Sequence, residues 1–329
     1  MKKVLALVLC LALCAGVIPF AGAEGAVKTG LAATVALTPT DATENKDGQI
    51  RSDVNIAAVT VDAEGKITSC KIDSVRADVK FNAKGELTQD AATTTFSSKN
   101  VLKEEYGMKA ASSIGKEWYE QVDALAQHCV GKTAEEIRGI AVDDSGKATD
   151  ADLLAGVTMS ISGFVDLVAT AAENAKDLGA QDGDTLYLTV TANMSSSKAA
   201  SENKDGTAQV DVNYAAITKN GETITSCTID AVSCKGTFSA EGKVTSDTTA
   251  EVKTKMQLGD DYGMKGVSPI GKEWYEQVEG FCAYVTGKTA ADVAGIAIDE
   301  STKTTDADLA ATTTISIGTF LELIALTAE

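Results

Sequence analysis

The sequence predicts an α+β protein that consists of two tandem copies of one domain. The segment YGMKAASSIGKEWYEQV at residues 106–122 returns as YGMKGVSPIGKEWYEQV at residues 262–278, with 14 of 17 positions identical. The flanking residues repeat as well, so that roughly 30–174 corresponds to roughly 186–329. In each copy, segments typical of strands precede segments typical of helices, which is the order expected of an α+β domain.

The first half of each copy is predicted to be an antiparallel β-meander. Its candidate strands are rich in β-branched residues and are separated by short turns that contain glycine. Short links of this kind favour antiparallel pairing. In copy one the candidate strands are residues 31–38, 53–62, 66–75 and 79–81, and copy two begins with a strand at 186–192.

The second half of each copy is predicted to be helical. Apolar residues recur at helical spacing from Ile114 onward, and Gly131 marks the end of that helix. Thr133 is placed to cap a short helix that runs to Ile140. Residues 152–174 begin extended and become helical from about Ser162. The predicted buried face of the first helix consists of Ile114, Trp118, Val122, Leu125 and Cys129.

The chain begins with a predicted signal peptide at residues 1–23. Lys2 and Lys3 precede an apolar run, and the small residues of 21–23 suit cleavage before Glu24. Lipidation at Cys10 or Cys14 is disfavoured, because leucine precedes each cysteine. The remaining organisation is copy one at 24–174, a linker at 175–185 and copy two at 186–329, in a secreted or envelope-located protein.

The charge balance excludes some partners. Cleavage of the signal peptide removes Lys2 and Lys3 and takes the formal net charge from −18 to −20. Such a charge repels phosphate backbones and anionic headgroups, so neither nucleic acid nor a charged membrane surface is an expected partner. No later segment is apolar for long enough to span a bilayer, so no stable span is expected after cleavage.

Few residues offer reactive chemistry. The five cysteines that follow the signal peptide contain no CxxC pair, and Cys70 and Cys227, which correspond between the copies, are interpreted as small core residues. The single histidine, His128, has Tyr284 as its counterpart, which excludes a duplicated metal, Ser/His or Cys/His site. We expect an electron carrier or binding protein rather than an enzyme with its own substrate.

One motif near the end of each copy suggests a ligand site. Asp152 precedes Thr158 by six residues, with Gly156 between them, and Asp308 precedes Thr314 at the same interval. A threonine here can present its hydroxyl near a helix N-terminus that stabilises a phosphate, and a glycine allows close approach of a bulky group. The alternative is that the threonine simply caps the helix.

This segment resembles the flavin-attachment motif of the FMN-binding domains found in sodium-pumping quinone reductases and in secreted bacterial flavoproteins. The Gly107-Met108 turn, the Lys116-Glu117-Trp118 segment and Gly131-Lys132 precede it in similar order. The resemblance implies one FMN in each copy, esterified to Thr158 or Thr314 by a dedicated flavin transferase. It also implies a positioning role for Asp152 and Asp308, clearance at Gly156, and ring contacts from Lys109 and Tyr106.

The copies differ in how closely they follow the motif. Copy one has Ala155 and Val157 at positions where the family has Ser or Thr and Ala, and copy two has Thr312 in place of the glycine and Thr313 in place of the following alanine. Because a β-branched residue excludes positive φ and close backbone approach, Thr158 is preferred over Thr314 as the attachment site. For Gly107 in the YGMK segment, the alternative to ring contact is a tight turn that requires glycine.

Together these features predict an extracytoplasmic FMN-binding and electron-transfer module of a bacterial cell envelope, served by envelope redox partners. The alternative is a secreted or surface binding or structural protein, built from a duplicated domain without a cofactor. A hydrolytic enzyme is a more distant third, because no nucleophile and base recur in both copies.

Overall fold

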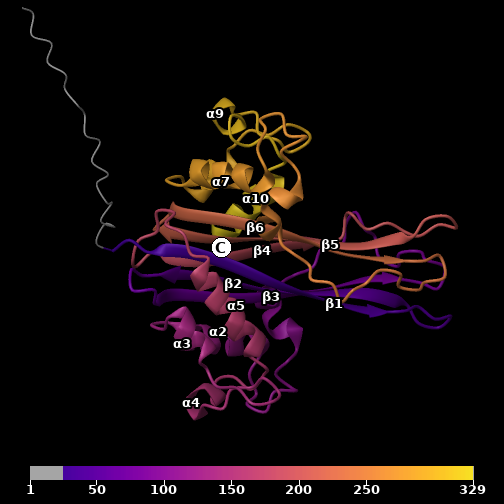
Figure 1. Cartoon of the computed structure of the whole chain (residues 1–329), viewed down its shortest axis with the longest axis horizontal. Helices are drawn as coiled ribbons and strands as arrows, with labels where there is room; N and C mark the ends of the chain where they lie inside the picture. Colours follow the sequence, from indigo (N-terminus) through magenta and orange to yellow (C-terminus); the bar gives the residue numbers. More distant parts are fainter. Residues whose placement is uncertain (1–24, 329) are drawn as a thin grey trace, which may run out of the picture.

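The computed structural model describes residues 25–328, so the predicted signal peptide at 1–23 and the cleavage point before Glu24 lie outside the described residues. The described chain forms two three-stranded antiparallel sheets, one from each copy (Figure 1). In copy one, strand order β1-β2-β3 comprises β1 (Lys28–Thr40), β2 (Gly48–Val61) and β3 (Ile67–Phe81). In copy two, the equivalent strands are β4 (Thr185–Asn193), β5 (Gly206–Asn220) and β6 (Thr223–Phe238). The predicted α+β class with two similar halves is confirmed.

Helices follow each sheet in the same order in both copies. Copy one has α1 (Lys99–Leu102), the 3₁₀ turn η1 (Lys103–Tyr106), α2 (Trp118–Cys129), α3 (Ala134–Arg138), α4 (Ala151–Leu154) and α5 (Ser162–Glu173). Copy two has α6 (Lys255–Leu258), η2 (Gly259–Tyr262), α7 (Trp274–Val285), α8 (Ala290–Ala294), α9 (Ala307–Ala310), α10 (Gly318–Ala325) and η3 (Leu326–Ala328).

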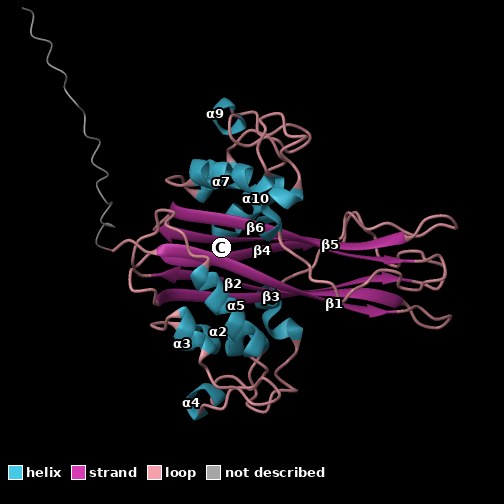
Figure 2. Cartoon of the chain, viewed as in Figure 1, coloured by secondary structure: helices cyan, strands magenta, loops and turns pink. Residues whose placement is uncertain are grey.

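The molecule has four layers. The two sheets stack on each other in the middle, and the helices of each copy cover the outer face of that copy's own sheet (Figure 2). The strands are longer than the helical layers and extend past them on one side.

The burial pattern of the central strands reflects this arrangement. In β2, buried and half-buried residues alternate from Gly48 to Asn55, and every residue from Ile56 to Val61 is buried. In β5, the same change occurs after Asn213. A strand covered on one face alternates, whereas a strand covered on both faces does not. Each strand therefore begins in the two-layer extension and ends between its helices and the other sheet.

A core shared by both copies holds the sheets together. It contains Val54, Val75 and Phe81 from copy one, with Val212 and Phe238 from copy two. The rings of Phe81 and Phe238 stack with their centres 4.0 Å apart and their planes within 3° of parallel. Each copy also has a core beneath its own helices, so this third core is the one that requires both copies.

The two phenylalanines lie over glycines of the neighbouring strand. Gly48 pairs with Phe81 and Gly206 pairs with Phe238 in strand register. A Cβ atom added to Gly48 would lie 2.6 Å from the Phe81 ring, and one added to Gly206 would lie 2.5 Å from the Phe238 ring. Both glycines are therefore needed for close approach of the aromatic ring.

The predicted linker packs against the sheet. Its backbone pairs with the start of β1, through Thr29 N–H to Lys176 O at 2.9 Å and Val27 N–H to Ala180 O at 3.1 Å. The Thr29 hydroxyl also shares a buried 2.7 Å hydrogen bond with that of Ser226 on β6. The start of β1 therefore bonds to the linker through its backbone and to copy two through a side chain.

Several local predictions are confirmed and others are wrong. Thr133 caps α3, and α5 begins at Ser162 as expected. The two strands expected at 66–75 and 79–81 are one continuous strand, β3, because its pairing with β2 runs through the polar residues between them. The short helices α1 and α4 were not predicted.

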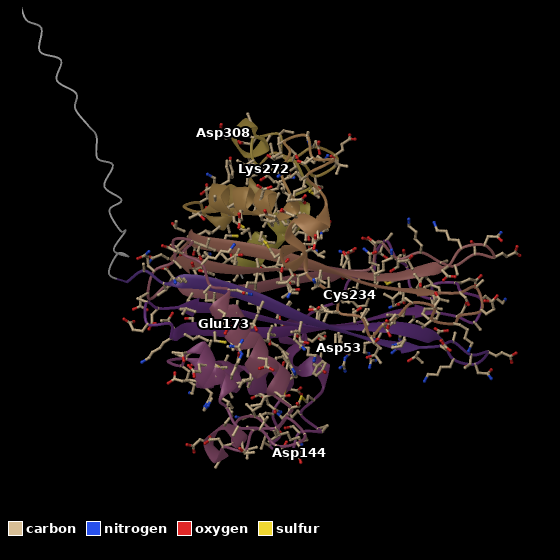
Figure 3. All side chains as sticks on the ribbon, in the orientation of Figure 1. Asp53, Asp144, Glu173, Cys234, Lys272 and Asp308 are labelled. Atoms are coloured by element: carbon tan, nitrogen blue, oxygen red, sulfur yellow. The ribbon has the colours of Figure 1, made fainter. Side chains whose placement is uncertain are left out.

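The cysteines are reduced and buried. All five in the described residues are free, and Cys70 and Cys227 lie in the cores beneath the helices, as predicted. Cys234 lies instead between the sheets (Figure 3). Among residues 25–328, no helix combines the length and the apolar character needed to cross a membrane.

We predict that Phe81→Ala destabilises both copies together. Loss of a fully buried phenylalanine costs about 3–5 kcal/mol, and loss of an aromatic pair adds about 0.5–1.5 kcal/mol. Calorimetry should show one transition for the native chain, shifted to lower temperature in the variant. The matched control is Phe96→Ala, which removes a half-buried ring at the margin of the same core and should have a smaller effect. Independent melting of the two copies would contradict the shared core.

Candidate functional site

The motif threonines occupy equivalent positions, and neither is a helix cap. In copy one, the backbone N–H of Thr158 donates to Gln121 Oε1 at 2.9 Å, and its hydroxyl donates to the same oxygen at 3.4 Å. In copy two, Thr314 makes both bonds to Gln277 Oε1 at 2.8 and 3.1 Å. The following helices begin after Ile161 and Ile317, so the alternative reading of these threonines as N-caps is wrong.

The buried glutamine joins three segments of each copy. Gln121 lies on α2, and its amide nitrogen donates to the Ser112 hydroxyl and to the Lys116 carbonyl, both at 3.2 Å. Gln277 makes the equivalent bonds to Ser268 and Lys272 at 3.2 and 3.1 Å. Because both ends of the amide are bonded, the motif threonine is held in a fixed position relative to α2 or α7.

A buried glutamate shapes the neighbouring turn. The Glu117 carboxylate accepts the backbone N–H groups of Met108 at 2.8 Å and Lys109 at 3.0 Å. Glu273 does the same for Met264 and Lys265 at 2.8 and 2.9 Å. The preceding glycine, Gly107, has a φ of 74°, which a glycine adopts without strain. The turn therefore accounts for the glycine of YGMK.

A lysine flanked by aromatic rings lies beside this turn in both copies. Lys99 is only 7% exposed, and its Nζ lies 4.9 Å from the centre of the Tyr106 ring and 4.8 Å from that of Trp118. In copy two, Lys255 Nζ lies 5.3 Å from the Tyr262 ring and 5.0 Å from the Trp274 ring. Within residues 25–328, neither ammonium group has a carboxylate within 4.0 Å.

A second buried carboxylate anchors the lysine. Asp73 on β3 accepts the backbone N–H groups of Ser74 at 2.7 Å and Asn100 at 3.1 Å, which fixes α1 and Lys99 against the sheet. Burial raises the pKa of Asp73 to about 6, although these hydrogen bonds and the Lys99 charge oppose the increase. Asp230 holds α6 in the same way through Ala231 and Met256.

In copy two, these groups line one cleft of about 460 Å³. Its walls bring together the motif threonine, the glutamine, the lysine and three aromatic rings. They include Lys255, Tyr262, Trp274, Gln277, Thr314 and Phe320. Copy one has the same arrangement of Tyr106, Trp118 and Phe164, with ring centres 6.5 and 6.1 Å from the tryptophan. We call the cleft of copy two and the matching side-chain cluster of copy one the lysine–aromatic clefts, and the cleft volume refers to copy two alone.

Some of the predicted site residues lie elsewhere. Asp152 and Asp308 are exposed on the short helices α4 and α9, and Asp308 is at the outer end of the molecule (Figure 3). Neither Asp308 nor Lys265 lines the cleft of copy two, and Lys109 is exposed. Thr314 and Tyr262, the counterpart of Tyr106, are the predicted residues that do line it.

Gly156 has a packing role that the sequence did not reveal. Its φ is not positive, and a Cβ atom added to it would lie 2.9 Å from the Cβ of Ala124 on α2. In copy two, the glycine is on the helix instead, where a Cβ on Gly280 would lie 2.7 Å from that of Thr312. Each copy therefore has one glycine at this contact, and the argument that Thr312 blocks a positive φ is wrong.

The other substitution in the copy-two motif is also accommodated. Thr313 replaces the buried Val157, and its hydroxyl donates to the Gln277 carbonyl at 2.8 Å. A buried hydroxyl that donates to a carbonyl avoids the cost of an unsatisfied polar group. The local structure around Thr314 is therefore as well formed as that around Thr158.

Comparison with known proteins gives one short similarity. No protein-family model matches the chain, and no solved structure gives a match. A stretch of 41 residues is 49% identical to part of a protein named chlorophenol reductase from Desulfitobacterium hafniense. The match spans 12% of this chain and 12% of that protein, so it defines neither a family nor an activity. In the described part of the chain, no group of three or more His, Cys, Asp or Glu side chains is arranged to hold a metal ion.

We predict that copy two tolerates loss of the glycine at position 280 only if a glycine is placed at position 312. Gly280→Ala alone should lower the free energy of unfolding by about 1–3 kcal/mol, because its Cβ meets Thr312. Adding Thr312→Gly recreates the Ala124–Gly156 pair and should recover most of the loss in urea unfolding. Alanine is favoured over glycine in a helix by ~1 kcal/mol. If Gly280→Ala stabilised the protein by this amount, close packing between position 280 and Thr312 would be contradicted.

We also predict that Asp73 makes stability fall as pH rises. Its folded-state pKa of about 6 exceeds its ordinary value of 3.8, so the folded protein retains a proton that the unfolded chain loses. The stabilising contribution is complete below about pH 4 and is lost as pH rises to about 6. Urea unfolding should therefore show the stability of native protein relative to Asp73→Asn decreasing over this range. A difference that does not vary with pH would contradict the raised pKa.

Proposed function

We propose that each lysine–aromatic cleft holds one FMN, attached through its phosphate to Thr314 in copy two and to Thr158 in copy one. We further propose that the protein is an electron-transfer module, either secreted or held in a bacterial cell envelope. Its partners would be a flavin transferase and envelope redox proteins. The signal-peptide pattern of residues 1–23 supports this location.

One observation carries the proposal: Thr314 lines the same cleft as an aromatic pair and a lysine that, among residues 25–328, has no carboxylate within 4.0 Å. FMN combines a flat aromatic ring system with a phosphate group. Aromatic side chains suit the ring, and an uncompensated ammonium suits the negative charge. The cleft volume of about 460 Å³ lies within the range of small-molecule sites.

Different side chains of copy two have different roles in the proposed binding. Gln277 fixes the backbone and hydroxyl of Thr314, while Glu273 fixes the turn that carries Met264 into the cleft wall. Lys255 supplies the positive charge, with its stem along Tyr262 and Trp274. Bound FMN would supply one- and two-electron chemistry that the side chains of the cleft do not provide.

Copy two supports this proposal despite its two departures from the motif. The substitutions Thr312 and Thr313, which set copy two apart from the motif in sequence, are accommodated by Gly280 and by a hydrogen bond. We therefore propose two flavins on one chain, one in each outer layer, where each can reach a different redox partner (Figure 1).

The test is the intact mass and visible absorbance of protein produced in a host that contains a flavin transferase. We expect two additions of about 440 Da each, one lost in Thr158→Ala and the other lost in Thr314→Ala. Lys255→Met should weaken binding of free FMN to the Thr314→Ala, Thr158→Ala double variant by about tenfold, the size of one charge-assisted contact.

The matched controls are Ser160→Ala and Ser316→Ala, which remove a second hydroxyl two residues after each threonine; Ser316 also lines the cleft of copy two, so it tests which hydroxyl carries the flavin. They should retain both additions. A colourless protein at its unmodified mass, with no affinity for added FMN, would overturn the proposal.

That outcome would favour the second candidate, a binding or structural module without a cofactor. The observation in its favour is that Ala155 and Val157 depart from the attachment motif in copy one. The shared core of the two sheets would then serve to present two rigid outer layers, rather than to carry electrons.

A further inference from the structure

A larger cleft lies at the junction of the two copies, away from the lysine–aromatic clefts. It has a volume of about 860 Å³. One wall is formed by β1 and the segment that follows α5, and the other by β6, α6 and α7. The inner surface is largely apolar, with Leu31 and Ala32 from copy one facing Met256, Val278 and Cys282 from copy two. We call this the junction cleft.

Comparison of the two copies shows which side chains make room for the junction cleft. Thr228 and Ala283 line it, whereas their counterparts in copy one are the longer side chains Lys71 and Gln127. Met256 replaces the polar Asn100. Gln257 and Thr286 differ in the opposite direction, because their counterparts in copy one are Val101 and Val130. The shorter side chains of Thr228 and Ala283 therefore make room for a ligand, and Met256 and Ala283 give part of the wall an apolar surface.

Charges around the junction cleft are mainly negative. Glu173, Asp177, Asp230 and Glu279 line it with a single cation, Lys176. Lys176 pairs with Glu279 at 3.1 Å, across the boundary between the copies.

Two of these carboxylates have no cation beside them. Arg138, outside the lining, pairs with Glu173 through a 2.8 Å bond from Nη2 to Oε2. Among the described residues, no basic side chain lies within 4.0 Å of the carboxylates of Asp177 and Asp230. The cleft therefore keeps a negative charge after its ion pairs are counted.

Asp230 places part of this negative charge inside the wall. It is 8% exposed and accepts hydrogen bonds from the Tyr214 hydroxyl at 3.1 Å and from the N–H groups of Ala231 and Met256 at 2.7 and 3.0 Å. These neutral donors satisfy its oxygens but leave its charge without a counter-ion. Burial raises the pKa of Asp230 by disfavouring its charged form, and a bound cation would stabilise that form.

We propose that the junction cleft binds a small organic cation with an apolar body, such as an aromatic or alkyl ammonium compound. The apolar walls take the body, and Asp230 and Asp177 attract the positive charge. Anionic molecules of the same size, including those with a phosphate group, are repelled. The junction cleft and the lysine–aromatic clefts are thus selective for opposite charges, and this site does not depend on flavin binding.

The test compares three bicyclic aromatic probes of similar size by isothermal titration calorimetry at pH 7: N-methylquinolinium (a cation), quinoline (neutral) and 2-naphthoate (an anion). We expect the cation to bind at least about tenfold more tightly than quinoline, and the anion not to bind, as is typical of a site in which one charge contact decides selectivity. Ala283→Phe, which fills the cleft, should abolish binding. Asp177→Asn, which removes one of the two carboxylates that attract the charge, should weaken binding of the cation by several-fold, and Glu279→Gln, which makes the charge of the lining less negative, should weaken it as well.

Controls come from the equivalent positions of copy one. Gln127→Phe and Asp123→Asn make the matching changes on α2, outside the junction cleft, and should leave the affinity unchanged. Equal affinities for the cation and the neutral probe would overturn the charge selectivity. Absence of heat from the cation at millimolar concentration, or full binding by the Ala283→Phe variant, would overturn the site.

Discussion

Packing of the two sheets against each other is the contact on which the rest of this protein depends. A three-stranded sheet has two faces, and other elements must cover any face that is buried. In each copy, helices of the same copy cover the outer face of the sheet, and the sheet of the other copy covers its inner face. The stacked rings of Phe81 and Phe238 lie in this shared core, each over a glycine of the neighbouring strand. Duplication therefore produced two copies that share one core between their sheets.

Buried polar side chains then position the candidate sites on this rigid support. Asp73 fixes α1 to the sheet, Glu117 fixes the YGMK turn, and Gln121 fixes the motif threonine to α2. Each accepts backbone N–H groups, and Asp230, Glu273 and Gln277 repeat the arrangement in copy two. The junction cleft differs, since it exists where the copies meet and has side chains that do not repeat. Polar contacts that are present in both copies thus maintain the two flavin sites that we propose. Side chains that differ between the copies form the junction cleft.

Patterns among residues that are close together in the sequence were sufficient to predict much of the fold. The spacing around Trp118 and the cap at Thr133 depend on nearby residues, and both predict a helix at the right place, although α2 begins at Trp118 and not at Ile114. The lysine–aromatic clefts could not be predicted in this way, because Lys99 meets Trp118 only after Asp73 has docked α1 on a strand far earlier in the chain. One signal was present, since a lysine precedes the YGMK tyrosine by seven residues in both copies. The role of Gly156 was wrongly interpreted because its partner on α2 is distant in sequence.

The reciprocal placement of glycine also restricts how the two repeats can exchange genetic material. Copy one pairs Ala124 with Gly156, and copy two pairs Gly280 with Thr312. A recombination event that transfers only the motif from copy two into copy one would set a threonine against Ala124 and create a clash, and the opposite transfer would leave a void. Only exchanges that include both the helix and the motif preserve the packing. Selection against partial exchange would keep the two copies distinct in this region, even though the neighbouring GKEWYEQV segment is identical in both.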